Sequence, residues 1–223
     1  MYNAYMAESI HLDNYCERTN ELFWSEPINA LTNIAFLIAA YFAYKFWKAK
    51  AGGEKEILVL TWILAIVGVG SFLFHTFATS RTMLADVIPI GLFIYLAIFS
   101  AAYRVFGLKR LAAMAVVIGF FGFNYLCEKY IPADWLNGSM MYIPALSALL
   151  TMTLVAKKMN LQAHKAFMAA TIIFVVSLSL RSVDMLACDY TPMQIGTHFM
   201  WHVLNGLLMF NVIRGLLLGD VKK

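Results

Sequence analysis

Seven long apolar runs constrain the fold of this chain more than any other feature of its sequence. Each is about 20 residues long, enough for a helix rising 1.5 Å per residue to cross the hydrocarbon core of a bilayer. Of the 223 residues, 61% are hydrophobic and 13% are charged, whereas soluble domains are closer to half apolar and a quarter charged. We therefore predict an all-α bundle of seven transmembrane helices, over the runs Ile28–Trp47, Ile57–Phe77, Met83–Phe106, Leu111–Cys127, Ser139–Lys157, Ala166–Asp184 and His198–Leu218.

The predicted spans divide the chain into three parts. Residues 1–27 form an N-terminal segment outside the membrane, residues 28–218 form the membrane domain, and residues 219–223 form a short tail. The N-terminal segment contains acids and has no apolar core, so we expect it to be retained rather than cleaved as a signal peptide. Residues that end helices fall between the runs, as at Gly107 and Pro132.

Basic side chains alternate between the two sides of the predicted membrane. Of the 17 Lys and Arg residues, 13 fall on one side and four on the other. Because basic loops stay in the cytoplasm, we expect the N-terminus outside and the C-terminus inside. The basic residues do not gather on one face, which argues against a nucleic-acid partner. Most of the acids fall on the outer side, which suits the binding of cations.

Three histidines fall within the predicted spans, all at one depth. His198 and His202 are four residues apart, so a helix places both imidazoles on one face. Alone, this pair is a weak signal, because histidines near a membrane surface are common. His75 ends the second run, which leads outward, whereas the other two begin the seventh run, which leads inward. Three imidazoles at the outer level fit a zinc ion whose fourth position is open to water.

Ser71 and Asp86 have the same predicted depth as the histidines. Ser71 precedes His75 by four residues and faces the same way, although a hydroxyl bonded to its own helix is the alternative. The carboxylate of Asp86 can orient or deprotonate water at a metal, although an acid near a helix start is also favoured by the dipole alone. Asp184 is either a partner that fixes a histidine tautomer or an interfacial acid.

The three cysteines also fall on the predicted outer side, where a disulfide is permitted. A bond between Cys16 and Cys188 would tie the N-terminal segment to the loop before the last span. The alternative is three free thiols, with Cys127 as the third.

Together these motifs resemble the alkaline ceramidase family. The resemblance rests on GxGSxxFH in the second run, on Asp86 followed by Pro89, on HxxWH in the seventh run, and on an N-terminal stretch with Tyr15, Cys16 and Glu17. The motifs occur in the family's order, over about residues 13 to 210.

The resemblance implies a zinc-dependent amidase that cleaves ceramide, or a related lipid amide entering from the bilayer, into a long-chain base and a fatty acid. It assigns the zinc to His75, His198 and His202. It makes Asp86 the acid and base, and Ser71 a donor to the oxyanion.

The family also binds calcium through its N-terminal segment, which implies Asp13, Asn14, Glu17 and Glu26 as ligands here. The match departs from the family at Asn14 and at Thr19, and the spacing from Glu17 to Glu26 is shorter. The shortened segment resembles a bacterial branch of the family. That branch implies a multi-pass protein of the bacterial inner membrane, with the metal site towards the periplasm.

Three other functions fit parts of the pattern. A receptor of the adiponectin-receptor type shares seven spans and a three-histidine zinc site, but would bind a lipid without turnover. An intramembrane serine protease would use Ser71 as nucleophile and would be insensitive to chelators. A structural or transport protein with interfacial histidines would contain no metal.

Overall fold

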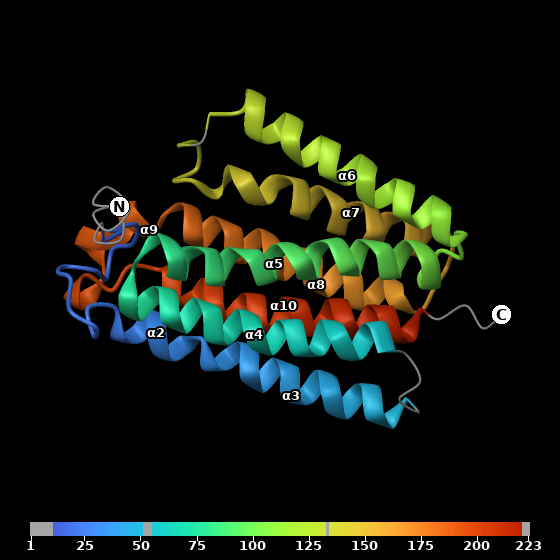
Figure 1. The fold of residues 1–223 in the computed structure, drawn as a ribbon, viewed down its shortest axis with the longest axis horizontal. Helices are drawn as coiled ribbons and strands as arrows, with labels where there is room; N and C mark the ends of the chain where they lie inside the picture. Colours follow the sequence, from blue (N-terminus) through green and yellow to red (C-terminus); the bar gives the residue numbers. More distant parts are fainter. Residues whose placement is uncertain (1–10, 51–54, 133, 220–223) are drawn as a thin grey trace, which may run out of the picture.

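The protein is a bundle of long helices, and Figure 1 shows them running side by side. A computed structural model describes residues 11–50, 55–132 and 134–219. Seven helical spans are long and apolar enough to cross a membrane, and the described residues contain no β-strand, which confirms the predicted all-α bundle. The first ten residues of the predicted N-terminal segment and the last four of the predicted tail lie outside the described residues.

The spans begin and end within a few residues of the predicted runs. They are α2 (Pro27–Thr32) continued by α3 (Ile34–Ala49), α4 (Lys55–Phe77), α5 (Ser80–Ser100) continued by the π-helix η1 (Ala101–Val105), α6 (Arg110–Tyr130), α7 (Ile143–Lys158), α8 (Ala163–Ser182) and α10 (His198–Leu218). The short helix η2 (Ser139–Tyr142) precedes α7, and α9 (Asp184–Ala187), η3 (Cys188–Tyr190) and η4 (Pro192–Gln194) connect α8 to α10.

The start of the third span was predicted three residues too late. Helix α5 begins at Ser80 because Thr79 adopts an extended backbone and caps it, its hydroxyl accepting a hydrogen bond from the backbone N–H of Thr82 at 3.3 Å. Such a capping box satisfies amides that the first turn of a helix leaves free. The polar residues that hydropathy assigns to a loop therefore form the first turn of the helix.

Helix α10 is the central helix of the bundle and α6 is the most peripheral (Figure 1). In α10, 67% of an 18-residue stretch is buried inside the protein, compared with 6% in α6. Helices α3, α4 and α8 all pack against α10. The two histidines at the start of α10 therefore lie in the middle of one end of the bundle.

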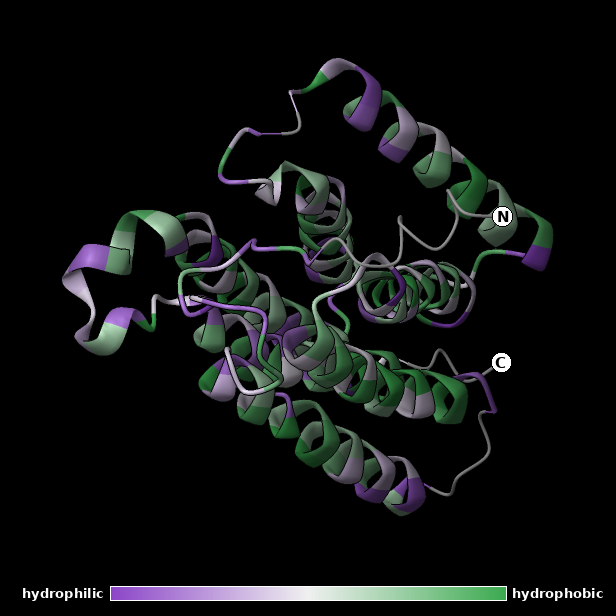
Figure 2. Ribbon diagram, turned by 60° about the vertical axis from the view of Figure 1, so that its left-hand side comes forward, coloured by the Kyte–Doolittle hydropathy of each residue, from purple (hydrophilic) through white to green (hydrophobic). Residues whose placement is uncertain are grey.

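The outside of the bundle is apolar along the helices. Figure 2 shows hydrophilic residues gathered at helix ends and in loops, while the helix bodies are hydrophobic. Large apolar side chains such as Trp62, Ile118 and Ile172 are exposed. A soluble protein rarely exposes so much contiguous apolar surface, so this surface is the one that faces lipid.

The end of the bundle that carries the histidines is covered by the N-terminal segment, drawn in dark blue in Figure 1. Cys16 of this segment is joined by a disulfide to Cys188, with 5.5 Å between the Cα atoms, and Cys127 is free. The backbone N–H of Cys16 donates to Asp184 at 3.0 Å, and that of Leu12 donates to the Ala78 carbonyl at 2.8 Å. The segment is thus fixed to the turn between α4 and α5 and to the connection between α8 and α10.

Candidate metal centre

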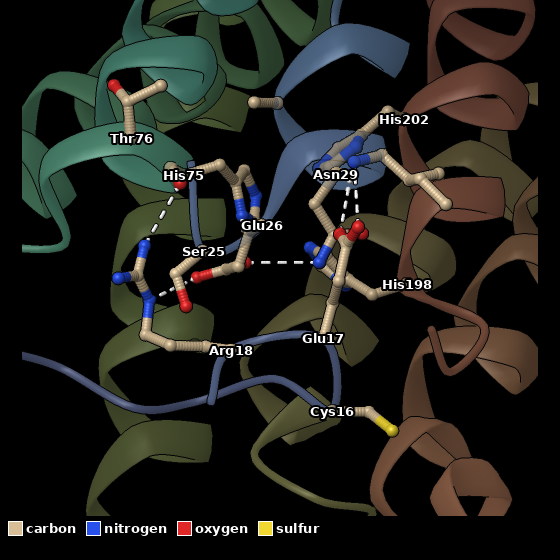
Figure 3. Close-up of polar contacts among 12 residues, drawn as sticks. Cys16, Glu17, Arg18, Ser25, Glu26, Asn29, His75, Thr76, His198 and His202 are labelled. Carbon is tan, nitrogen blue, oxygen red and sulfur yellow. Dashed lines mark hydrogen bonds and ion pairs between the residues drawn. The ribbon is translucent and has the colours of Figure 1, made fainter. Parts of the chain in front are cut away.

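Three buried imidazoles converge at this end of the bundle (Figure 3). His75 comes from the last turn of α4, and His198 and His202 come from the first two turns of α10. One ring nitrogen from each lies within 4.8 Å of the other two, and no more than 2% of any of the three residues is exposed. Because α4 and α10 are antiparallel, the end of α4 lies beside the start of α10. The three histidines, which the sequence predicted to share one depth, therefore also lie close together.

His75 is oriented by a carboxylate from the N-terminal segment. Its Nδ1 donates to Glu26 at 2.6 Å, which leaves Nε2 free for a metal. Glu26 also accepts from the Arg18 guanidinium and from the Asn29 side chain. Burial alone would raise the pKa of Glu26, but the hydrogen bond from His75, the charge of Arg18 and the hydrogen bond from Asn29 together hold the pKa below its ordinary value. An ionised carboxylate behind a metal-binding histidine fixes its tautomer and raises its basicity.

His202 is oriented by a threonine hydroxyl. Its Nδ1 lies 3.0 Å from Oγ1 of Thr32, and this hydroxyl donates to the Ile28 carbonyl at 2.7 Å. Because the Thr32 hydroxyl already donates its hydrogen to the helix backbone, its oxygen accepts a hydrogen bond from Nδ1 of His202. The Nε2 atom of His202, like that of His75, is then the unprotonated nitrogen that a metal needs.

His198 is held at its backbone and on its ring face. Asp184 accepts from the backbone N–H of His198 at 2.8 Å and from that of Thr197 at 2.6 Å, so it caps α10. Asp184 was predicted to be either a partner that fixes a histidine tautomer or an interfacial acid. It contacts the backbone of His198 and not the ring, so this contact does not fix the tautomer. Tyr15 stacks on the His198 imidazole, with 3.7 Å between ring centroids and 18° between ring planes. Burial raises the pKa of the Tyr15 phenol, which therefore remains neutral.

A metal ion fits the nitrogens that this arrangement leaves without partners. Nε2 of His75 and Nδ1 of His198 are buried and have no hydrogen-bond partner among the described residues. Leaving a buried polar atom unpaired costs about 1–3 kcal/mol. Three imidazole nitrogens, two of them preset by a carboxylate and a hydroxyl, form the donor set that zinc takes in catalytic sites.

Ser71 and Asp86 lie beside each other, and Ser71 is one helical turn from His75. The Ser71 side chain interacts with the Asp86 carboxylate, whose Oδ1 is buried and has no hydrogen-bond partner among the described residues. Gly70 makes this pairing possible, because a Cβ there would lie only 2.0 Å from the Ala85 carbonyl oxygen. Helices α4 and α5 therefore touch backbone to backbone immediately before the two side chains.

An apolar cavity opens below the histidines, between α5, α7, α8 and α10. Its walls include Phe36, Phe93, Tyr142, Leu149 and Trp201. Phe36 also lies 6.3 Å from the His202 ring, between centroids. The residues of α10 on its wall run from Trp201 to Val212, a helix length of about 16 Å. The cavity could hold a lipid chain whose polar end reaches the histidines.

The four predicted calcium ligands make other contacts or face solvent. Asp13 and Asn14 are exposed. Glu17 caps α2, accepting from the backbone N–H of Ile28 at 2.7 Å and from that of Asn29 at 2.8 Å. Burial raises the pKa of Glu17, and its two backbone hydrogen bonds act against the rise. Glu26 is the partner of His75, so the residues present do not form a cluster of free oxygens, which is what calcium needs.

The residues that orient the histidines could not be recognised from the sequence. Glu26 was assigned to calcium, and Thr32 and the stacking role of Tyr15 were not identified. Only the acidic character of the segment pointed to Glu26, because its partner is 49 residues away in the chain. Thr32 stands one turn after Ile28 on a span, where a threonine bonded to its own helix is ordinary.

Comparison with known proteins agrees with this geometry. The model of the family described as Ceramidase matches residues 12–222, nearly the whole chain. None of the curated proteins compared with the chain matches it. The matched region contains all three histidines, Ser71 and Asp86, and it includes the N-terminal segment from Leu12 onward. The chain belongs to the ceramidase family.

Proposed function

We propose that the protein is a zinc-dependent amide hydrolase that cleaves ceramide or a related lipid amide into a long-chain base and a fatty acid. One observation carries the proposal. Three buried imidazoles, two of which have a ring nitrogen without a hydrogen-bond partner among the described residues, lie next to a serine–aspartate pair and close to an apolar cavity. Family membership supports amide hydrolysis, and the donor set supports zinc.

A zinc ion at the three histidines would polarise the amide carbonyl and make water acidic enough to attack near neutral pH. The chain's own residues supply the rest. Asp86, whose Oδ1 has no hydrogen-bond partner among the described residues, would accept a proton from water and return it to the leaving amine. Ser71 would donate a hydrogen bond to the oxygen on which negative charge develops. Glu26 and Thr32 hold two imidazoles in the tautomer that binds metal.

The apolar cavity supports a lipid substrate that enters from the bilayer. Its walls come from transmembrane helices, and its upper end is formed by Tyr142 and Trp201. Phe36 lies on the wall of this cavity and also 6.3 Å from the His202 ring, between centroids, so a chain bound there would have one end close to the histidines. We further propose a bacterial inner-membrane protein, because the shortened N-terminal segment resembles a bacterial branch of the family, and we orient the histidine end towards the periplasm from the charge distribution.

The test is metal content measured beside turnover. His75→Ala, His198→Ala and His202→Ala should each abolish zinc binding, by elemental analysis of purified protein, and release of fatty acid from a labelled ceramide. Asp86→Asn should keep the zinc and lose about 100- to 10,000-fold in rate, as expected for loss of a general acid and base. Full activity in zinc-free protein would refute the proposal, and tight lipid binding without turnover would favour the receptor alternative.

A further inference from the structure

Arg18 is a buried cation within the N-terminal segment. Only 2% of its side chain is exposed, as is also true of Glu26, with which it pairs. Its guanidinium donates to oxygens from three parts of the chain. Nε donates to Glu26, Nη1 donates to the Asn20 carbonyl at 3.2 Å, and Nη2 donates to the His75 carbonyl at 3.0 Å. Figure 3 shows Arg18 directed at Glu26 and at His75.

These three acceptors form the kind of oxygen cage that holds a metal cation. One carboxylate and two backbone carbonyls, drawn from a loop and a helix end, are typical ligands of a hard dication. In this chain their lone pairs point at the nitrogens of a guanidinium. Arg18 thus connects the N-terminal segment to the last turn of α4. A bound metal ion would make the same connection, but here the cation is a side chain of the protein.

The remaining acidic oxygens nearby are also engaged. Both oxygens of Glu17 accept backbone N–H groups at the start of α2, and the second oxygen of Glu26 accepts from His75 and Asn29. A calcium ion here would have to displace these donors and lie next to a fixed positive charge. Like charges at such distances repel strongly in a buried site.

We propose that Arg18 is the resident cation of this segment and takes the place of a calcium ion, so that the metal centre forms without calcium. Arg18 acts through Glu26, whose carboxylate it holds in position to accept from Nδ1 of His75. It is a positioning residue, because it touches neither the substrate cavity nor the three metal-binding nitrogens. The activity readout below rests on the proposed hydrolase function, whereas zinc affinity and melting temperature do not.

The experiment compares wild type, Arg18→Ala and Arg18→Lys, each depleted of calcium and reloaded with zinc. Arg214→Ala, at an exposed arginine of α10, is the matched control. Each protein is assayed with no addition, with millimolar Ca²⁺ and with guanidinium ions at non-denaturing concentration. The readouts are zinc affinity by chelator competition, the melting temperature of the zinc-free protein, and release of fatty acid from a labelled ceramide.

Wild type and Arg214→Ala should respond to neither ion. Arg18→Ala should lose on the order of 10- to 100-fold in zinc affinity, the usual effect of removing support behind a metal-binding histidine. Ca²⁺ or guanidinium should restore this affinity and raise the melting temperature, and Arg18→Lys should retain part of both. If Arg18→Ala does not fold, wild type and Arg18→Lys decide the question.

Three results would overturn the proposal. The first is calcium-depleted wild type that has lost zinc affinity and regains it with Ca²⁺. The second is Arg18→Ala with wild-type zinc affinity. The third is a weakened Arg18→Ala that neither cation restores, which would make Arg18 a packing residue. Zinc affinity that follows the proposal in a protein that releases no fatty acid would leave Arg18's role standing and refute the hydrolase.

Discussion

The contact between α4 and α5 at Gly70 yields the sharpest prediction about catalysis. A Cβ at Gly70 would lie 2.0 Å from the Ala85 carbonyl oxygen, 2.7 Å from its carbonyl carbon and 3.3 Å from the Asp86 nitrogen. The obstacle is backbone, so no side-chain rotation can relieve it. The two helices must separate by about 1 Å to restore even a 3.0 Å contact in Gly70→Ala. Ser71 and Asp86 directly follow the two contact points, so the separation falls on that pair.

The expected loss follows from this displacement. Misplacing a reacting group by about 1 Å can reduce the rate by about 100-fold, which is about 2.7 kcal/mol on the barrier. Overpacking should also lower the free energy of unfolding by about 1–3 kcal/mol, partly offset by the better helix propensity of alanine. Zinc should be retained, because the three histidines come from α4 and α10 and none from α5.

The assay measures kcat/KM on a labelled ceramide and zinc per protein on the same preparation. Gly119→Ala is the matched control, since a Cβ there meets nothing within 4 Å and α6 is peripheral. It should leave both quantities unchanged. If Gly70→Ala kept wild-type kcat/KM, the close helix contact would not position the serine–aspartate pair. If it lost zinc in proportion to activity, the contact would support the metal site instead.

Three other substitutions test the support of the metal centre. Glu26→Gln should weaken zinc binding by about 10- to 100-fold in chelator competition, while the exposed Glu21→Gln should not; equal affinities would remove Glu26 from the site. Thr32→Val removes one neutral hydrogen bond, worth about 0.5–1.5 kcal/mol, so the loss of zinc affinity should be smaller, and a loss as large as that of Glu26→Gln would contradict this order. Cys16→Ser should lower the free energy of unfolding by about 2–4 kcal/mol, and Cys127→Ser should not; the same melting temperature in both variants would contradict a stabilising disulfide.

The sequence predicted the bundle and the grouping of the histidines because both depend on patterns along single helices. Run length and charge alternation determine the number of spans and their relative directions. Antiparallel directions then place His75 level with His198. The α4–α5 contact was partly predictable in the same way, because small residues such as Gly68 and Gly70 allow helices to approach closely. Which residue of α5 the glycine meets depends on helix rotation, which hydropathy does not determine.

The contacts that orient the histidines were not predictable, because they join distant parts of the chain through side chains with several ordinary uses. An acid before a helix can cap it, bind calcium or hold a histidine. Glu17 does the first and Glu26 does the third, although the sequence presents them alike. The choice depends on Arg18, which lies between the segment and α4 and which in the sequence is only one basic residue among 17.

The predicted division into an extramembrane segment and a membrane domain therefore separates residues that act together. The transmembrane helices supply the three histidines and the serine–aspartate pair. The segment supplies the carboxylate behind His75, the ring over His198 and the cysteine that ties it to the α8–α10 connection. A membrane domain that began at Ile28 would keep all three imidazoles and lose the ionised partner that presets one of them. Since preset tautomers strengthen metal binding by three histidines, the functional unit begins in the N-terminal segment rather than at the first span.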